Sequence, residues 1–401
     1  MDMRHVPERR PVRRSPTALW IATAQIAVLY AGSTLLSPLY HLYREAFGFS
    51  QLTLTLIYSA YVLGNLTALL PLGRLSDQAG RRAVNLAAVA IGACATLLFL
   101  LASSPAWLFA GRIVSGLGIG LGASATTAWL AELTPDRRRA TLFATEGNFA
   151  GLALGALTAG LLAAYLPSPL RLSYASYLVV LCATGFALAR APETVPRPVR
   201  SPKRLSLRPR LGVPRELLGA FAAPAAIGFA TFAVVGYYLA LIPSVMAHAL
   251  HQGSPAAGGG VVALLAVLGA AAGLMSRELS SRTAMLGGGL LLLPGIALLP
   301  CAEWLHSLAL LLCGTAITGP ATMLSYRGSL QVVNEMAPAE RRGEITASYI
   351  VCMYAGNSLP IIGIGVLTAA ASSLIADVIF AIVIAACVVL ALLIGAARLP
   401  R

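Results

Sequence analysis

Long apolar runs recur along almost the whole of this sequence, and they restrict the folds available to it more than any other feature. Twelve of these runs are long enough to cross about 30 Å of hydrocarbon as helices. They lie near residues 17–40, 51–72, 83–103, 106–131, 140–166, 172–190, 216–242, 256–276, 283–301, 305–329, 344–370 and 372–397. Only 11% of the 401 residues are charged and the mean hydropathy is +0.79, which excludes a soluble domain with a polar surface. The sequence therefore predicts an all-α membrane protein with twelve transmembrane helices.

The placement of the basic residues predicts how these helices are oriented. All but three of the 29 Lys and Arg residues fall in the N-terminal tail, in or beside the loops after even-numbered helices, or at the C-terminus. The exceptions are Arg44 and Arg171, in loops on the other side, and Arg112, inside the fourth helix. The positive-inside rule then places both termini in the cytoplasm, with the helices in a bacterial inner membrane. This topology accounts for the net charge of +14, with anionic lipid as the partner and no role for nucleic acid.

A polar segment rich in proline and arginine divides the chain into two halves of six helices. The predicted units are a cytoplasmic N-terminal tail (1–16), a helical bundle (17–190), a cytoplasmic linker (191–215), a second bundle (216–397) and a C-terminal tail (398–401). Glu132-Leu-Thr-Pro, after the fourth helix, matches Glu335-Met-Ala-Pro, after the tenth, about half a chain length away. Unless this is a chance likeness between two loops, the halves are repeats, as in a carrier whose two bundles rock about a central site.

The loop between the second and third helices carries the most specific motif, Gly73-Arg-Leu-Ser-Asp77-Gln-Ala-Gly80-Arg81-Arg82. It resembles the signature loop of the major facilitator superfamily, Gly-x-Leu-x-Asp-x-x-Gly followed by two basic residues. Its glycines permit a tight reversal, and its arginines hold the loop at anionic headgroups. The resemblance implies two pseudo-symmetric six-helix bundles, and it implies that Asp77 latches them together at the cytoplasmic face. A plain solvated turn is the alternative.

The predicted latch consists of this motif and the charged residues at the neighbouring cytoplasmic helix ends. These residues can form charge-assisted hydrogen bonds with the motif. It comprises Gly73, Asp77, Gly80, Arg81, Arg82, Glu132, Arg138, Glu335 and Arg342. The second half has no good copy of the loop, because residues 277–282 are shorter and lack an aspartate. One strong latch is therefore expected.

The fourth helix contains Arg112-Ile-Val-Ser-Gly-Leu-Gly, which resembles the second motif of the same family. An arginine about 9 Å inside a membrane span is costly unless it faces a wet cavity or a partner, or extends back to the interface. The fifth helix has Gly147, Gly151 and Gly155 at a spacing that allows close helix approach, expected here against glycines of the eighth helix. The drug/proton antiporters of the family have a glycine-proline signature in this region, but no proline follows Gly155.

In this family the first, fourth, seventh and tenth helices line the cavity, and further polar and aromatic residues come from their neighbours. The predicted substrate-binding residues are Gln25, Tyr30, Thr34, Tyr61, Arg112, Asn148, Phe232, Tyr237, Tyr326, Tyr354 and Asn357. Each of them can instead form a hydrogen bond between helices. As a set they are aromatic and mostly neutral, which favours a mildly polar or amphipathic substrate over a multiply charged one.

Ionisable residues inside helices are few. Glu146 is the one acid well inside an inner helix and is the predicted proton-coupling residue, while Asp377, near the start of the last helix, is expected to form a surface pair. The histidines and cysteines have no metal-ligand spacing, and neither a catalytic constellation nor a phosphate-binding loop is present. The sequence therefore predicts a protein that is not an enzyme and that uses no cofactor, metal or ATP.

The resemblance implies a secondary transporter that moves a small molecule by alternating access, and proton-coupled efflux by a monomer is the favoured interpretation. An importer or facilitator of a sugar or other metabolite is the first alternative, since Pro192-Glu193-Thr194 is similar to a segment of sugar carriers. A non-transporting receptor or assembly factor is the alternative from another class, and a collapsed cavity would indicate it.

The predicted topology is testable by thiol labelling. Single cysteines replacing Ser50, between the first two helices, and Ser201, in the linker, should differ in their reaction with an impermeant reagent added to intact cells. Only the cysteine at position 50 should react, because the linker is cytoplasmic in this topology. Labelling of both positions, or of position 201 alone, would overturn the orientation.

Overall fold

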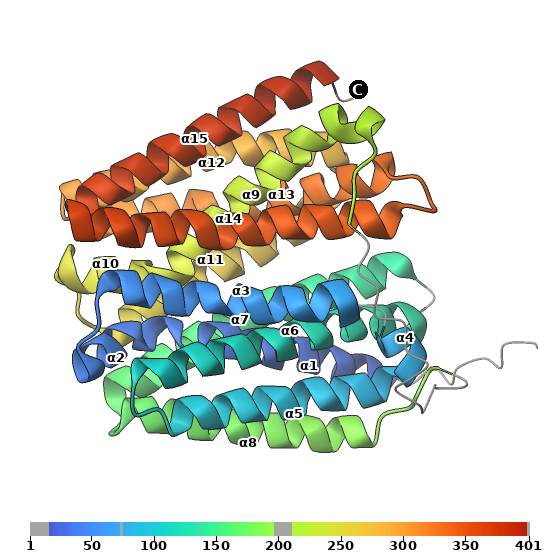
Figure 1. Ribbon diagram of the computed structural model, residues 1–401, viewed down its shortest axis with the longest axis horizontal. Coiled ribbons are helices and arrows are strands. Elements are labelled where there is room, and N and C mark those ends of the chain that lie inside the picture. The colour runs from blue at the N-terminus through green and yellow to red at the C-terminus, as the bar shows by residue number, and fades with distance from the viewer. Residues whose placement is uncertain (1–15, 73–74, 135, 196–210, 399–401) are drawn as a thin grey trace, which may run out of the picture.

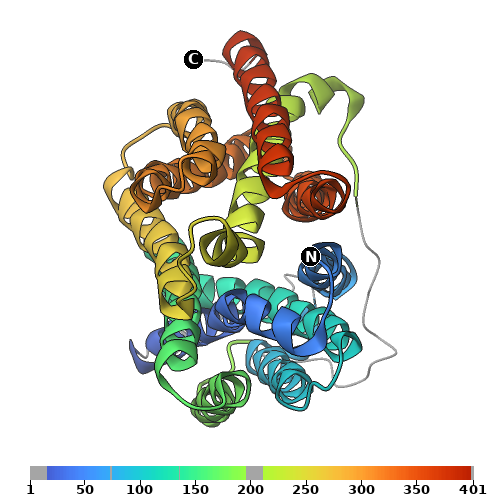
Figure 2. The same cartoon turned by 90° about the vertical axis from the view of Figure 1, so that its left-hand side faces the viewer.

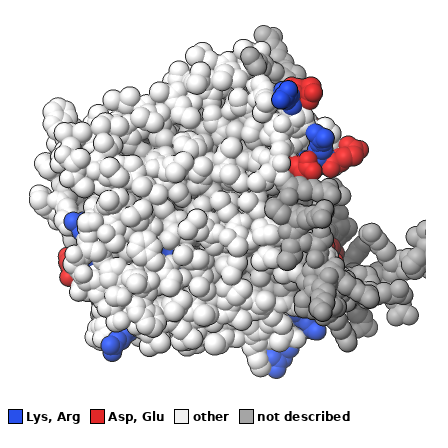
Figure 3. Space-filling model, in the orientation of Figure 1, with Lys and Arg blue, Asp and Glu red and all other residues white. Residues whose placement is uncertain are grey.

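The computed structural model describes residues 16–72, 75–134, 136–195 and 211–398, without the side chains of Arg137, Arg138 and Arg398. Within these residues, twelve helices are long and apolar enough to span a membrane, which confirms the predicted fold class. Charged side chains on the face in Figure 3 gather toward its two ends, with a broad and almost uncharged band between them. Such a band is what a hydrocarbon core requires of the surface it contacts.

The helices form two groups that lie side by side (Figures 1 and 2). The first group contains the long helices α1 (Pro16–Thr34), α3 (Gln51–Leu72), α5 (Arg81–Leu100), α6 (Pro105–Leu133), α7 (Arg137–Tyr165) and α8 (Pro169–Ala189). The second contains α9 (Leu218–Ala240), α11 (Pro255–Met275), α12 (Ser281–Trp304), α13 (Leu308–Met336), α14 (Arg342–Ala370) and α15 (Ser373–Arg398). The part of the linker that includes Ser201 lies outside the described residues.

The helix of the first predicted span ends earlier than expected, the seventh ends close to its predicted bound, and each is followed by a separate short helix. The first is interrupted after α1 and continues as a 3-10 turn (Ser37–Leu39) and α2 (Tyr40–Phe47), and the seventh is interrupted between α9 and α10 (Ile242–His248). Pro38 and Pro243 lie at the start of these short elements, where a proline lacks the donor that would continue the preceding helix. α2 and α10 pack together at one end of the molecule. We call this the α2 end. The opposite end, where α4 (Leu75–Ala79) and the described ends of the linker (191–195 and 211–215) lie, is the linker end.

The two groups meet mainly through α3 against α14 and α7 against α11. A Cβ added at Gly259 of α11 would lie 2.3 Å from the carbonyl oxygen of Ala156 on α7, so this contact requires glycine. The glycine stripe predicted to pack on the eighth helix packs instead on α1. A Cβ at Gly151 or Gly155 would lie 2.2 or 2.1 Å from the carbonyl oxygen of Ala27 or Ala31. The stripe therefore tightens its own half, and α11 packs on other residues of α7, among them Phe149, Ala153 and Ala156.

Candidate substrate cavity

A cavity of about 570 Å³ lies between the two halves and receives residues from both. A second hollow of about 460 Å³ shares Tyr30, Asn148, Phe149 and Tyr326 with it and extends past Ala140, near the start of α7 at the linker end. The shared lining makes one continuous path from the centre of the molecule toward that end.

The α2 end of the cavity is closed by direct contacts between the halves. The Tyr58 hydroxyl on α3 donates a hydrogen bond of 3.0 Å to Asn357 Oδ1 on α14. Farther toward the α2 end, Gly365 of α14 sits against α3, where an added Cβ would lie 2.2 Å from Thr55 Oγ1. The cavity is thus open toward the linker end and shut toward the α2 end.

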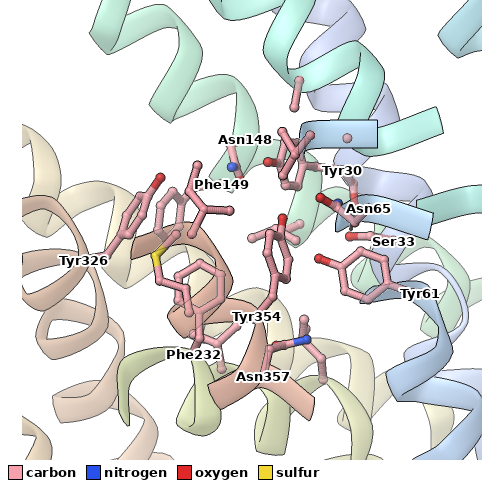
Figure 4. Close-up of a pocket in the computed structure, with 18 of the residues that line it drawn as sticks. Tyr30, Ser33, Tyr61, Asn65, Asn148, Phe149, Phe232, Tyr326, Tyr354 and Asn357 are labelled. Atoms are coloured by element: carbon pink, nitrogen blue, oxygen red, sulfur yellow. Dashed lines mark hydrogen bonds between the residues drawn. The ribbon is translucent and has the colours of Figure 1, made fainter. Parts of the chain in front are cut away.

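Aromatic rings form a continuous wall around the central space (Figure 4). Tyr61 and Tyr354 meet edge to face with ring centroids 6.0 Å apart, Phe232 lies 6.0 Å from Tyr354, and Tyr326 lies 5.7 Å from Phe232. This chain of rings runs from α3 in the first half to α13 in the second. Rings at such spacings offer both faces and edges to an aromatic or apolar ligand.

Arg112 is the one cation among the residues that line this cavity, and the lining contains no carboxylate. Its side chain is 2% exposed, and its guanidinium lies 5.2–5.7 Å from the ring centroids of Tyr40, Tyr58 and Tyr61. Its Nη1 donates to the Ser33 carbonyl oxygen at 3.1 Å, whereas Nε has no hydrogen-bond partner. Cation–π contacts therefore contribute to its stabilisation, and no carboxylate of the described residues forms an ion pair with it.

Eight of the eleven predicted substrate-binding residues line the cavity. They are Tyr30, Tyr61, Arg112, Asn148, Phe232, Tyr326, Tyr354 and Asn357. Gln25, Thr34 and Tyr237 do not, because each is used in packing between helices. Gln25 donates to Asn85 Oδ1 at 2.7 Å, Thr34 donates to the Leu152 carbonyl oxygen at 2.9 Å, and Tyr237 bonds Asp377.

Several cavity residues were not singled out by the sequence. Phe149, Thr231, Thr322 and Met353 line the central space, and Phe149 lies next to the predicted Asn148 (Figure 4). A phenylalanine in an apolar helix gives no sign of whether it faces lipid, another helix or a cavity. Only its adjacency to Asn148 could have indicated it.

The predicted latch motif forms a compact charge cluster at the linker end. Arg81 is buried, and its guanidinium bonds Asp77 at 2.5 Å and Glu132 at 2.7 Å. Glu193, which the sequence reading did not include in the latch, accepts hydrogen bonds from the backbone nitrogens of Arg81 at 2.8 Å and Arg82 at 3.0 Å. A carboxylate at this position satisfies free amide groups at the start of α5 and complements the helix dipole.

Gly80 is the glycine that this arrangement requires. Its φ of +103° is unfavourable for other residues, and an added Cβ would lie 2.6 Å from Glu193 Oε2. In the second half, Glu335 accepts a hydrogen bond from Ser281, and Arg342 begins α14. Gly73 and the side chain of Arg138 lie outside the described residues. The ion pairs that join described members of the predicted latch all lie within the first half, so a latch between the halves stays a prediction.

Glu146 lies on α7 but is not among the cavity-lining residues. It is half-buried and close enough to Arg277, just beyond α11 in the other half, for electrostatic attraction. Asp377, expected at the surface, is instead buried within the second half, where the Tyr237 hydroxyl donates a hydrogen bond to it. The expectation failed because the start of α15 packs inward against α9.

Comparison with known proteins identifies the class. The sequence profile described as Major Facilitator Superfamily matches residues 23–361, and the chain belongs to this family. It is a multi-pass membrane transporter of the superfamily and not an enzyme.

Similar sequences cover short segments. The multidrug resistance protein MdtL of Citrobacter koseri is 34% identical over 91 residues, which is 23% of each chain. The arabinose-proton symporter of Bacillus subtilis is 27% identical over 113 residues, covering 28% of this chain and 24% of the symporter. The chain thus matches about a quarter of the length of these curated relatives.

Similar structures cover nearly the whole chain. A D-xylose-proton symporter superposes with a TM-score of 0.74 at 16% identity, over 94% of this chain and 96% of the symporter. A bacterial homologue of the human lysosomal transporter Spinster, solved inward-facing and occupied, gives 0.74 at 17% identity, over 93% of this chain and 96% of the homologue. At these identities the likeness shows the fold alone.

The charge cluster generates a prediction for Asp77. Asp77→Asn should leave insertion intact and cost less than about 1 kcal/mol of stability, because its side chain is 55% exposed. It should nevertheless slow transport several-fold, since Arg81 would be freed from one of its two carboxylates. Substrate uptake into vesicles containing equal amounts of each protein measures this. Asp136→Asn, which removes an exposed 3.7 Å pair with Arg139 at the same end, is the control. An unchanged rate for Asp77→Asn would show that the loop is only a turn.

Proposed function

We propose that this protein is a secondary transporter that exports a small, mildly polar or amphipathic molecule across the bacterial inner membrane by alternating access, coupled to protons. The observation that carries this proposal is the aromatic cavity between two similar halves, open toward one end and closed at the other. With the linker end in the cytoplasm, as the positive-inside rule indicates, the conformation is inward-facing. The protein then takes its substrate from the cytoplasmic side or the inner leaflet.

The lining of the cavity supports a substrate class. It combines a wall of aromatic rings with one buried cation and no acid, so neutral or singly anionic aromatic compounds fit it better than polycations. The name of one similar protein, a multidrug resistance protein, is consistent with such a substrate.

A sugar importer is the second candidate. It is favoured by the similarity to an arabinose-proton symporter and by Glu193, which belongs to the Pro192-Glu193-Thr194 segment and caps α5. Sugar hydroxyls need many hydrogen-bonding partners. The amide side chains that line the central cavity are Asn65, Asn148 and Asn357, which are few for such a substrate. A receptor without transport activity is not favoured by a cavity of about 570 Å³.

Purified protein in liposomes distinguishes these functions. Uptake of a panel of aromatic amphiphiles, aromatic acids, pentoses and hexoses is measured with and without an imposed pH gradient. We expect accumulation of aromatic amphiphiles or acids against their gradient when protons flow in the opposite direction. Pentose or hexose accumulation driven by protons moving the same way would favour the importer, and no flux of any compound would favour the receptor.

The aromatic wall should contribute directly to substrate affinity. Phe232→Ala removes the ring between Tyr326 and Tyr354 and should raise the Kd of an aromatic substrate about three- to tenfold. Equilibrium binding by scintillation proximity or calorimetry measures the change. Trp20→Ala, which removes a largely exposed ring of α1 that is not part of the cavity, should leave the Kd unchanged. Equal effects of the two variants would contradict the proposed binding wall.

Glu146 is the proposed coupling residue. Glu146→Gln should abolish the dependence of transport on the pH gradient while substrate binding persists, because glutamine cannot exchange a proton. Arg112→Ala should instead damage binding or folding. An arginine does not release its proton, so Arg112 cannot carry the coupled proton, and its guanidinium holds the tyrosine rings together at the α2 end of the cavity. Uphill transport by Glu146→Gln at the wild-type rate would exclude Glu146 as the coupling site.

A further inference from the structure

Two carboxyl groups meet inside the second half, away from the substrate cavity. Glu303, near the end of α12, and Asp377, in the first turns of α15, are 5% and 3% exposed, and their side chains interact directly. The Tyr237 hydroxyl donates a hydrogen bond to Asp377, and the Ser373 hydroxyl donates one of 2.5 Å to Glu303. Within the described part of the chain, neither carboxyl forms an ion pair.

A cavity of about 220 Å³ adjoins this pair at the α2 end and is lined by both halves of the molecule. Arg44 and Gln51 come from the first half, and they bond each other at 2.8 Å instead of reaching the acids. On the opposite wall, the Ser244 hydroxyl is 6% exposed and has no hydrogen-bond partner. Glu303 Oε2 likewise receives no hydrogen bond from a donor group among the described residues. Two buried polar atoms without a hydrogen-bond partner therefore lie at this small cavity, beside the carboxyl pair.

The titratable groups around the pair do not supply a neutralising charge in this conformation. α2 contributes Arg44, which is bonded to Gln51, and α9 contributes Tyr237, a donor to Asp377. α10 contributes His248, whose Nδ1 contacts its own helix at the Ser244 carbonyl oxygen. α14 contributes Ile364 and Thr368, which do not titrate. His41 of α2 is buried and interacts electrostatically with the exposed Glu45 and with His248.

Two adjacent carboxyl groups that are removed from water and lack a cation cannot both carry a negative charge. We propose that Glu303 and Asp377 form a proton-binding site, which holds a shared proton when the α2 end is closed and gives it up when that end opens. The inference rests on the alternating access proposed above, but not on the direction of transport or on Glu146. The chemistry is a simple acid dissociation, in which the proton leaves to water entering from the α2 end.

Protonation of the carboxyl pair is coupled to opening of the α2 end because the two walls of the small cavity belong to different halves of the molecule. Opening the α2 end would withdraw Arg44 and Gln51 with the first half, because both belong to it, and would bring water to the carboxyl groups. A solvated pair can ionise, whereas closing the end again buries the charge unless a proton is taken up. Acid therefore favours the closed α2 end and alkali the open one.

The experiment measures this conformational equilibrium directly. Spin labels on cysteines replacing Ala46 of α2 and Gln252, in the loop after α10, report the distance across the α2 end by pulsed electron paramagnetic resonance. Both positions are exposed, and the six native cysteines are removed from the full-length chain. In reconstituted protein, we expect the ratio of open to closed molecules to rise with pH, by up to about tenfold per unit for a linkage of one proton. A ratio that does not change with pH would overturn the proposal.

Variants assign the effect to the carboxyl pair. Asp377→Asn and Glu303→Gln, which replace an acid by an amide of similar shape, should each stay closed and lose the pH dependence. Glu45→Gln, an acid-to-amide change at an exposed position of α2, should retain it. His248→Gln should also retain it, and loss of the pH dependence in His248→Gln alone would overturn the assignment. Closure driven by sodium at constant pH would show that the site takes a metal cation instead.

The same proteins separate this inference from the proposed function. A wild-type protein that exchanges substrate without any response to a pH gradient, yet closes at low pH through Asp377, would refute proton-coupled export and leave the proton site standing. Conversely, proton-coupled export by a protein whose α2 end opens and closes independently of pH would support the proposed function and refute the proton site.

Discussion

A charge inside a membrane protein must be neutralised, solvated or surrounded by polarisable groups, and much of this structure follows from that constraint. Arg112 is stabilised by three tyrosine rings and a carbonyl oxygen. Arg81, at the membrane boundary, is paired with two carboxylates. The acids Glu303 and Asp377 have hydroxyl donors and each other, with no cation. These are three different solutions, and each one limits what the surrounding helices can do.

Features read along the chain were predictable from the sequence. The hydrophobic runs predicted the number of spanning helices, and the spacing of glycine, aspartate and arginine in the loop after the second helix predicted the family, which the sequence profile confirms. The break after α1 and the short helix α10 were missed, although Pro38 and Pro243 were visible. An apolar run alone does not show whether a helix continues through a proline or restarts in a new direction.

The faces of the helices were much less predictable. Apolar residues surround each span on all sides, so no hydrophobic period distinguishes a cavity-facing side from a lipid-facing or helix-facing one. Tyr61 and Tyr237 look alike in the sequence, yet one lines the cavity and the other bonds Asp377. Asp377 itself was assigned to the surface because it lies near the end of an outer helix. Only the packing of α15 against α9 shows that this end is buried.

The closed α2 end joins the substrate cavity to the carboxyl pair through one set of contacts. When α3 and α14 meet, the Tyr58 hydroxyl bonds Asn357. The rings of Tyr58 and Tyr61 are then held over Arg112 at the α2 end of the substrate cavity. The same approach of the halves brings Arg44 and Gln51 to the small cavity beside Asp377. A ligand that changes the spacing at α3 would alter the free energy of burying the acids, and a proton on the acids would alter the shape offered to the ligand. Two sites that respond to one motion are thermodynamically linked, so binding of a ligand in the cavity and binding of a proton at the carboxyl pair must affect each other equally. This linkage needs no direct contact between the ligand and the proton.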